Sequence, residues 1–371
     1  MHKIIIADTT LRDGEQSAGV AFTIAEKVKI AVMLDNMGVK EIEAGIPVMG
    51  DMEKKAIKKI LNKNLKARII GWNRALFADI DESISCGLNS VSISLPVSDI
   101  QIHYKLNKTR KWVLEQLKKV IYYAKKNKLY LIVGAEDASR ADLNFLLEYV
   151  RTIKKEGADR FKFCDTVGVL EPLSMFSLIQ YLCKKVNIDI EVHTHNDFGL
   201  ATANALAGVL AGAGFVDTTV TGIGERAGNA ALEQVVLALI YIYGLNTGIE
   251  MKKISRLAEF VSKAAGRVIP ESKPIIGKNC FLHESGIHQD GILKNPVTYE
   301  PFNPSVLGKK SRMVIGKHSG KSGIRYFLKT KGIVSDRTLN KILKDTKHKT
   351  SFLKKRFLHK EISFPHSYSI E

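Results

Sequence analysis

Two histidines separated by one residue, His193 and His195, lie at the end of a short apolar segment that is typical of a β-strand. Successive side chains of a strand alternate between its faces, so both imidazoles point to the same side, about 7 Å apart along the backbone. Asp13 lies in a polar loop after another apolar segment. Two histidines and one carboxylate form a facial ligand set that leaves positions open for substrate oxygens. We therefore predict a divalent metal site, with Mg²⁺, Mn²⁺ or Zn²⁺ as candidates, at Asp13, His193 and His195.

Two residues near this set have more than one interpretation. Asn229 follows the eighth predicted strand, and it is either a further oxygen ligand, a hydrogen-bond partner of a ligand, or the cap of a helix that it opens. Arg12 adjoins Asp13 and would place a fixed cation beside the metal, which suits stabilisation of an enolate or alkoxide oxygen. The alternative for Arg12 is a structural ion pair with Glu43 or Asp165.

Four other polar residues follow predicted strands and could contact a substrate. Glu136 is a candidate general acid or base, or a residue that orients one. Arg74 is a candidate clamp for a substrate carboxylate. Gln16 and Thr166 could donate hydrogen bonds to the same substrate, or each could cap a turn.

A repeated pattern of one short apolar segment and one longer amphipathic segment would position these residues. The predicted strands are residues 3–7, 40–44, 67–72, 90–95, 129–134, 160–164, 188–193 and 215–220. Eight such units in roughly 245 residues are typical of a (β/α)8 barrel. A doubly wound sheet usually has a glycine-rich phosphate loop after its first strand, and none follows residues 3–7. We predict an α/β fold, a TIM barrel followed by a smaller, mostly helical C-terminal region.

Within this organisation the first barrel helix is expected at residues 23–37, with Thr23 as its cap, and the last at residues 229–243. We place the catalytic barrel in residues 1–248, a C-terminal subdomain in residues 249–350 and a basic tail in residues 351–371. The glycine-rich segment 222–229 is either a phosphate loop or a tight turn, and the two interpretations are compatible. A helix is expected at residues 252–267, a loop-rich stretch at 270–322 and a further helix near 336–344.

The composition narrows the class of protein. A hydrophobic fraction of 45% is ordinary for a globular chain with a normal core. The net charge of +18 would suit nucleic-acid binding, but the lysines are scattered over predicted helices without interleaved aromatic residues, so we predict no nucleic-acid partner. No apolar run approaches the ~20 residues of a membrane helix, and the N-terminal apolar stretch is too short for a signal peptide. The four cysteines form no CxxC pair and fit free thiols in a reducing cytoplasm.

Four motifs together resemble those of the DRE-TIM metallolyase superfamily, and within it the synthases that make 2-isopropylmalate, citramalate or homocitrate. They are residues 10–16, 193–199, 224–229 and 285–291. The resemblance extends from residue 5 to about residue 325. It implies that Asp13, His193 and His195 bind a divalent metal and that Arg12 polarises a keto group.

The resemblance also implies the reaction and the remaining site residues. Glu136 and His288 would take part in proton transfer, and Tyr299 matches a family tyrosine near the site. In this family the last two residues typically come from the partner subunit, which implies a homodimer. The chemistry is a Claisen condensation, in which the enolate of acetyl-CoA attacks a 2-oxo acid and the thioester is then hydrolysed.

Details of the sequence favour one branch. No cysteine lies in residues 222–229, which disfavours the lyase branch, and the sequence does not include the long regulatory domain of typical 2-isopropylmalate synthases. Residues 72–74, 95–99 and 133–142 look most like nitrogenase-associated homocitrate synthases, which implies 2-oxoglutarate as the substrate and a link to nitrogen fixation. Lysine-pathway homocitrate synthases have arginine and serine at the positions of Ile132 and Gly134, so Arg74 becomes the candidate for the distal carboxylate. The alternative is a 2-isopropylmalate or citramalate synthase without a regulatory domain.

Overall fold

The computed structural model describes residues 4–329, 336–353 and 357–361. It divides into two compact units, which we describe separately. The first comprises Met1–Glu250 and Arg256–Val268, and the second comprises Met251–Ser255 and Ile269–Glu371. Most of α10 (Ile254–Ala264) therefore groups with the first unit, whereas the division made from the sequence placed it after the barrel.

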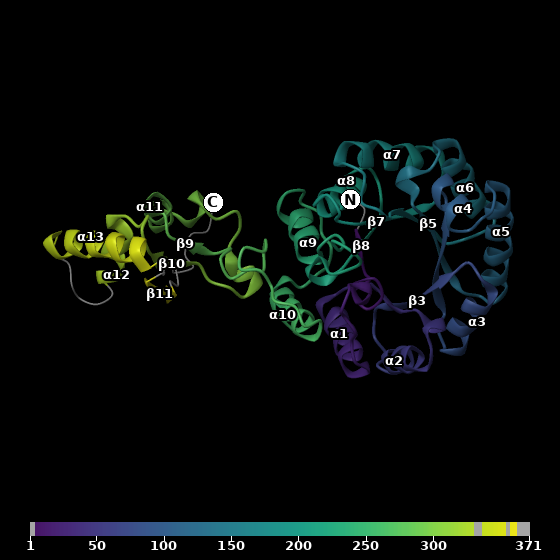
Figure 1. The fold of residues 1–371 in the computed structure, drawn as a ribbon, viewed down its shortest axis with the longest axis horizontal. Helices are drawn as coiled ribbons and strands as arrows, with labels where there is room; N and C mark the ends of the chain where they lie inside the picture. The colour runs from purple at the N-terminus through teal and green to yellow at the C-terminus, as the bar shows by residue number, and fades with distance from the viewer. Residues whose placement is uncertain (1–3, 330–335, 354–356, 362–371) are drawn as a thin grey trace. The chain divides into compact units, whose positions relative to one another are not determined.

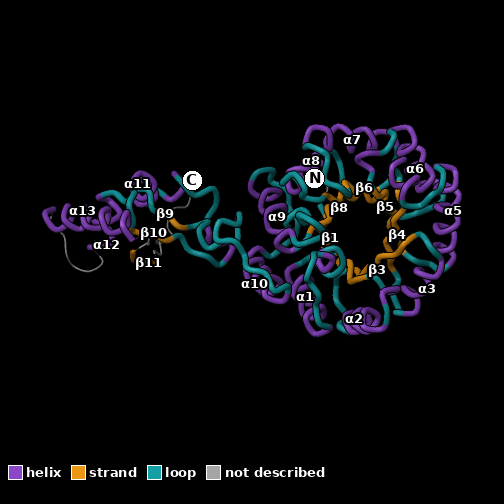
Figure 2. Tube along the Cα trace, in the orientation of Figure 1, coloured by secondary structure: helices purple, strands orange, loops and turns teal. Residues whose placement is uncertain are grey.

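The first unit is a closed barrel of eight parallel strands in sequence order, with β1 paired to β8 (Figures 1 and 2). The strands are β1 (Ile5–Asp8), β2 (Glu41–Gly45), β3 (Arg68–Arg74), β4 (Ser90–Pro96), β5 (Tyr130–Glu136), β6 (Arg160–Asp165), β7 (Asp189–Thr194) and β8 (Phe215–Thr218). The predicted TIM barrel is confirmed, because every predicted strand overlaps one of these. In Figure 2 the strands form an inner ring and the helices an outer one.

The helices of this unit are α1 (Ile24–Met37), α2 (Asp51–Leu61), α3 (Phe77–Ser85), α4 (Asp99–Tyr104), α5 (Arg110–Lys126), α6 (Leu143–Lys155), α7 (Pro172–Lys185), α8 (Ala201–Leu210), α9 (Leu232–Tyr241) and α10. Helix α1 has the expected boundaries: Thr23 and Glu26 form a reciprocal capping box, and Gly38 ends the helix at a φ of 104°.

The predicted start of the last barrel helix was wrong by three residues. Helix α9 begins at Leu232 because the preceding segment pairs as extended chain, with bridges from His195 to Asn229 and from Thr219 to Ala231. The N-cap is Ala231, so Asn229 does not cap this helix.

The barrel interior carries ion pairs where bulky branched side chains usually dominate. Charged residues alternate with apolar ones along three strands, so that the charged set faces inward and is buried. This inward set consists of Glu41, Glu43, Arg160, Lys162, Glu191 and His193.

The second unit contains a small three-stranded sheet in the order β11-β10-β9 and three helices. Its elements are β9 (Leu282–His283), α11 (Gly286–Lys294), β10 (Arg312–Ile315), α12 (Lys321–Lys329), α13 (Asp336–Leu353) and β11 (Phe357–Glu361). Ile315, Ile324 and Leu339 form one buried cluster that links the sheet to α12 and α13. The sheet was not predicted, and the expected tail contains the end of α13 and β11; residues 354–356 and 362–371 lie outside the described residues.

Short 3-10 helices complete the secondary structure, at Gly14–Gln16, Pro47–Met49, Ala138–Arg140, Val220–Gly222, Met251–Lys253, Pro296–Thr298 and Pro304–Leu307. Within the described part of the chain, no helix combines the length and the apolar character needed to cross a membrane.

Candidate metal centre

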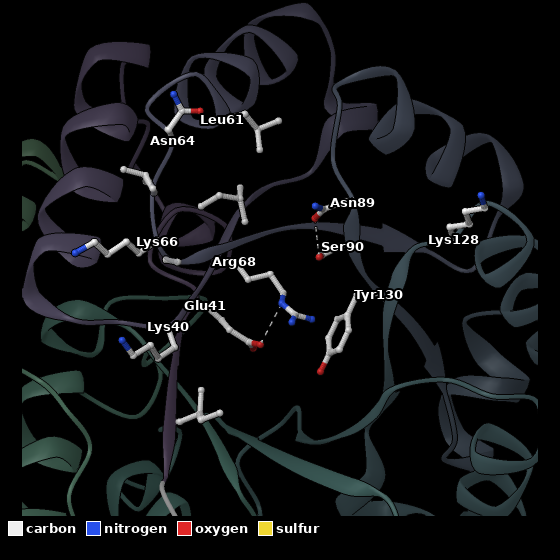
Figure 3. A pocket seen from close by; sticks show the side chains of 14 residues that line it. Lys40, Glu41, Leu61, Asn64, Lys66, Arg68, Asn89, Ser90, Lys128 and Tyr130 are labelled. Atoms are coloured by element: carbon white, nitrogen blue, oxygen red, sulfur yellow. Dashed lines mark hydrogen bonds and ion pairs between the residues drawn. The ribbon is translucent and has the colours of Figure 1, made fainter.

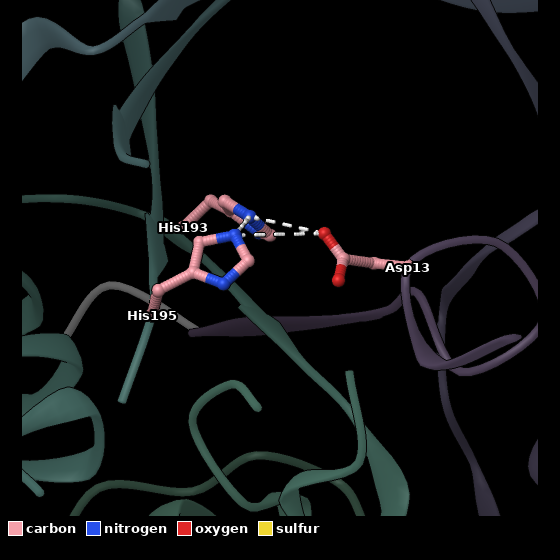
Figure 4. A group of neighbouring side chains, drawn as sticks. All are labelled: Asp13, His193 and His195. Atoms are coloured by element: carbon pink, nitrogen blue, oxygen red, sulfur yellow. Dashed lines mark hydrogen bonds and ion pairs between the residues drawn. The ribbon is translucent and has the colours of Figure 1, made fainter. Parts of the chain in front are cut away.

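Asp13, His193 and His195 converge at the carboxyl ends of β1 and β7, and all three side chains are buried (Figure 4). The Nε2 atoms of the two histidines lie 3.1 Å apart. Asp13 Oδ2 lies 3.5 Å from Nε2 of His193 and 3.7 Å from Nε2 of His195. The three predicted ligand atoms therefore form a compact triangle at the mouth of the barrel.

The triangle fits a divalent metal ion. Metal bonds to imidazole nitrogen and carboxylate oxygen are about 2.0–2.2 Å long, so adjacent ligand atoms stand roughly 3.0–3.6 Å apart. Burial, together with the nearby His193, lowers the pKa of His195 to about 4, so this imidazole is neutral at pH 7. Burial raises the pKa of Asp13, but Arg12 and the two histidines outweigh that effect and hold it well below its usual range. A neutral imidazole and an ionised carboxylate are the protonation states that metal coordination requires.

A carboxylate behind His193 fixes the orientation of its ring. Nδ1 of His193 lies 3.0 Å from Oδ2 of Asp217, an inward-facing residue of β8. With the Nδ1 proton donated to Asp217, the lone pair of Nε2 faces Asp13 and His195. This carboxylate–histidine arrangement is the usual support for a metal-bound imidazole.

The loop after β8 holds Asp13 from the other side. The side-chain nitrogen of Asn229 donates to Asp13 Oδ1 at 3.0 Å, and the backbone N–H of Glu225 approaches the same oxygen at 3.4 Å. The buried side-chain oxygen of Asn229 has no hydrogen-bond partner among the described residues. Asn229 thus contacts a metal ligand directly, and its own role as an oxygen ligand stays a prediction.

Gly224 lies where this loop passes over Asp13, and we expect Gly224→Ala to damage the metal centre. A Cβ at this position would lie 2.0 Å from the side-chain nitrogen of Asn229 and 3.0 Å from Asp13 Oδ1. The loop would have to move, so metal affinity should fall about 10–100-fold, as for other changes to groups that support metal ligands. Titration with Co²⁺ measures this. Gly214→Ala is the matched control, because a Cβ there meets nothing within 4 Å; equal Co²⁺ affinities of the two variants would contradict the expectation.

Arg12 both lies beside the metal ligand Asp13 and forms an ion pair with Glu43, the two alternatives that the sequence left open. Its Nε and Nη2 atoms lie 2.8 Å from Glu43 Oε2, and its Nη1 lies 3.0 Å from Asp13 Oδ2. The guanidinium also lies over the ring of Trp72, with 5.7 Å between Cζ and the ring centroid. Arg12 is therefore held in an ion pair with Glu43 and directed toward the metal ligands, and it has no contact with Asp165.

The other candidate substrate contacts at the barrel mouth already have partners within the protein. Thr166 accepts the backbone N–H of Asp137 at 2.8 Å. Gln16 is exposed, with its Oε1 3.5 Å from Nη1 of Arg12. Glu136 forms an ion pair with Lys105, with 2.6 Å between Oε1 and Nζ.

Arg74, the predicted carboxylate clamp, forms a forked ion pair with Asp79. Its Nε and Nη2 atoms each donate to one oxygen of this carboxylate at 2.8 Å. The arginine side chain is 58% exposed, whereas that of Asp79 is buried. Nη1 has no partner among the described residues, so one edge of the guanidinium remains for another anion.

A cavity of about 810 Å³ lies at the opposite end of the barrel, where β2–β5 begin (Figure 3). At its wall Arg68 lies over the ring of Tyr130 and 3.8 Å from Glu41. The amino ends of barrel strands generally contribute stability, whereas the carboxyl ends carry the chemistry. The metal centre at the carboxyl ends is therefore the candidate active site.

Comparison with known proteins identifies the family of this architecture. A family model described as HMGL-like matches residues 3–261, which is more than half of the chain. The chain belongs to the HMGL-like family. A second model, described as homocitrate synthase post-HMGL domain-like, matches residues 275–352.

Relatives of this HMGL-like protein include three synthases. The 2-isopropylmalate synthase 2 of Caldanaerobacter subterraneus subsp. tengcongensis is 50% identical over 97% of this chain and 94% of its own length. Homocitrate synthase 1 of Nostoc sp. is 50% identical over 96% of this chain and 95% of its own. The (R)-citramalate synthase CimA of Methanocaldococcus jannaschii is 47% identical over 92% of this chain and 70% of its own length. The chain is therefore an enzyme of this synthase group.

Among solved structures, a hydroxymethylglutaryl-CoA lyase from Pseudomonas aeruginosa matches with a TM-score of 0.65. The match covers 72% of this chain and 94% of the lyase, with 20% identity. At this identity the likeness concerns the fold, and it agrees with the HMGL-like barrel described above.

The second unit of the HMGL-like protein contains the remaining two predicted site residues. His288 lies on α11, and its ring stacks on that of Tyr299 with 4.1 Å between the centroids and 23° between the planes. His288 is exposed and Tyr299 is 39% exposed. Both side chains are thus paired with each other on the surface of their unit, and their catalytic roles stay predictions.

Sequence reasoning named Glu43 as a possible partner of Arg12, but it missed Asp217 and Lys162, which support the metal centre of this HMGL-like barrel. Glu43 holds Arg12, Asp217 holds His193, and Lys162 binds both carboxylates. A signal was present, because charged residues recur at every second position of the segments at Glu41 and Arg160. Both segments match predicted strands, and this alternation places the charged side chains of each strand on one face.

Proposed function

We propose that this enzyme condenses acetyl-CoA with 2-oxoglutarate to give homocitrate and CoA. The observation that carries the proposal is the buried set of Asp13, His193 and His195 with Arg12 fixed beside it. The preference for 2-oxoglutarate is supported by the match of residues 275–352 to a homocitrate synthase region and by the identity to the Nostoc enzyme. The product would then serve nitrogen fixation, and we expect the reaction to occur in the cytoplasm.

The residues of the barrel mouth suit each part of this reaction. A divalent metal held by Asp13, His193 and His195 would act as a Lewis acid toward a 2-oxo acid. Arg12 is a fixed donor where the keto oxygen of the 2-oxo acid gains negative charge, and its contact with Glu43 prevents it from reorienting.

Proton transfer requires a base and an acid near the reacting carbons. Glu136, paired with Lys105, is the candidate base for the methyl proton of acetyl-CoA. The resulting carbanion forms a bond to the carbonyl carbon of the 2-oxo acid, whose oxygen then takes a proton. Water finally replaces CoA at the thioester carbonyl and releases the thiol. We assign His288 and Tyr299, supplied by the second subunit of a homodimer, to the proton transfers of the later steps.

Recognition of the distal carboxylate requires a cation, and Arg74 remains our candidate. Because Asp79 occupies the Nε edge of its guanidinium, the substrate carboxylate would bind at the Nη1 edge. Gln16 and Thr166 are assigned to the remaining oxygens of the 2-oxo acid. Asn229 is assigned to the metal centre as a further oxygen donor, on the basis of its unpartnered oxygen.

The test is the rate of CoA release from acetyl-CoA with 2-oxoglutarate, 2-oxoisovalerate and pyruvate, each with and without a chelator. We expect the highest kcat/KM with 2-oxoglutarate and complete loss of the reaction on chelation. No turnover of 2-oxoglutarate would disprove the homocitrate assignment. The second candidate is 2-isopropylmalate synthase, which the 50% identity to the Caldanaerobacter enzyme favours; it predicts preference for 2-oxoisovalerate.

A further inference from the structure

One buried lysine in the barrel interior, Lys162, contacts three buried carboxylates. Lys162 Nζ lies 2.6 Å from Glu43 Oε1, 3.1 Å from Asp217 Oδ2 and 2.8 Å from Glu191 Oε1. The side chain of Lys162 is only 4% exposed. Burial lowers its pKa, but the three carboxylates outweigh this and hold the pKa well above its usual value, so the lysine stays charged.

Two of these carboxylates, those of Glu43 and Asp217, also each contact a residue of the metal centre. Glu43 gives Oε1 to the lysine, while its Oε2 accepts from Arg12 at 2.8 Å. Asp217 Oδ2 is shared between the lysine and Nδ1 of His193, which lies 3.0 Å away. One ammonium group thus connects the support of Arg12 to the support of a metal ligand.

We propose that Lys162 is a positioning residue of the active site, which keeps Arg12 and His193 in place through Glu43 and Asp217. Without this cation two buried carboxylates would repel each other and reorient toward the remaining cations. The ring of His193 and the guanidinium of Arg12 would then lose their fixed directions. The inference deepens the proposed function. Its expected effect on kcat rests on that function, whereas its expected effect on metal binding does not.

A purely structural role is the alternative, and the barrel offers a matched control for it. Arg160 lies two residues earlier on the same strand and is fully buried. It also forms ion pairs with two carboxylates, those of Glu41 and Glu191. Neither carboxylate contacts Arg12 or His193. Glu191 also contacts Lys162, but the contacts of Lys162 with Glu43 and Asp217 do not involve Arg160. Arg160→Met should therefore weaken the barrel as Lys162→Met does, but disturb the metal centre much less.

The test compares Co²⁺ binding and kinetics of the Lys162→Met and Arg160→Met proteins. For Lys162→Met we expect Co²⁺ affinity to fall about 10–100-fold and the visible absorption of bound Co²⁺ to change. At saturating Co²⁺, kcat should fall at least about tenfold, because Arg12 is misplaced in the transition state, and KM for the 2-oxo acid should change much less. For Arg160→Met we expect a lower Tm with Co²⁺ affinity and spectrum close to those of the unchanged protein.

Two results would overturn the proposal: unchanged Co²⁺ affinity and spectrum in folded Lys162→Met, or equal losses in both variants. If Lys162→Met does not fold, Lys162→Gln replaces it, since glutamine retains hydrogen bonds to the carboxylates without the charge, and the same two results apply. Co²⁺ binding requires no organic substrate. Failure to turn over 2-oxoglutarate, with the expected Co²⁺ pattern, would therefore contradict the proposed function and leave the role of Lys162 standing.

Discussion

Replacement of Asp13 by alanine is expected to lower the rate of CoA release by at least about 10³-fold. The substitution removes the only carboxylate of the described three-residue ligand set and leaves Arg12 with one of its two acidic partners. Metal affinity should fall with activity, because two neutral imidazoles bind a divalent ion far more weakly than two imidazoles and a carboxylate. The measurement is CoA release at saturating metal, together with a metal titration of the variant.

The matched control is Glu148→Ala, which removes an exposed carboxylate from the outer helix α6. This variant should keep the kcat and the metal affinity of the unchanged enzyme. If Asp13→Ala retained activity within tenfold of that control, neither the metal centre nor the condensation assigned to it could stand.

Arg12→Gln is expected to lower kcat by about 10²–10³-fold and to leave KM for the 2-oxo acid nearly unchanged. The guanidinium is held by Glu43 and Asp13 before any substrate binds, so its contribution to a developing negative charge costs no reorganisation. Glutamine carries no charge and lacks the fork that reaches both carboxylates.

Steady-state kinetics with the preferred 2-oxo acid measure this effect, and Arg12→Lys serves as the control that retains charge without the fork. The lysine variant should lie between glutamine and arginine. A kcat within tenfold of the unchanged enzyme for Arg12→Gln would show that the ion pair with Glu43 is the whole role of this residue.

The sequence predicted the features that depend on local pattern. The strands follow from short apolar segments, α1 from its capping box, and the metal set from the alternation of His193 and His195 at a strand end. Each of these signals lies within a few neighbouring residues or repeats along the chain. The barrel could be predicted because its eight units repeat the same local pattern.

What the sequence could not provide is the register between strands. Lys162 meets Glu43 across 119 residues, and that contact exists only because closure of the barrel brings β2 and β6 to the same level. A similar limit applies to Arg74, whose pairing with Asp79 depends on how the chain turns from β3 into α3. The two-residue strand β9 is too short to produce any periodicity at all.

The ion pairs inside the barrel have a consequence for charge balance. Among the described residues, the connected buried set holds three cations, Arg12, Arg160 and Lys162, against five carboxylates, those of Asp13, Glu41, Glu43, Glu191 and Asp217. Asp8, whose pKa burial raises to about 8, is mostly neutral at pH 7 and adds little to this total. The buried set thus contains more acidic than basic side chains, although burial raises the pKa of Glu191 and the partly exposed Arg68 lies 3.8 Å from Glu41. A divalent cation at Asp13, His193 and His195 would offset this excess of acidic groups. The ion that serves the chemistry at the mouth of the barrel would thereby also reduce the net negative charge buried in the barrel interior.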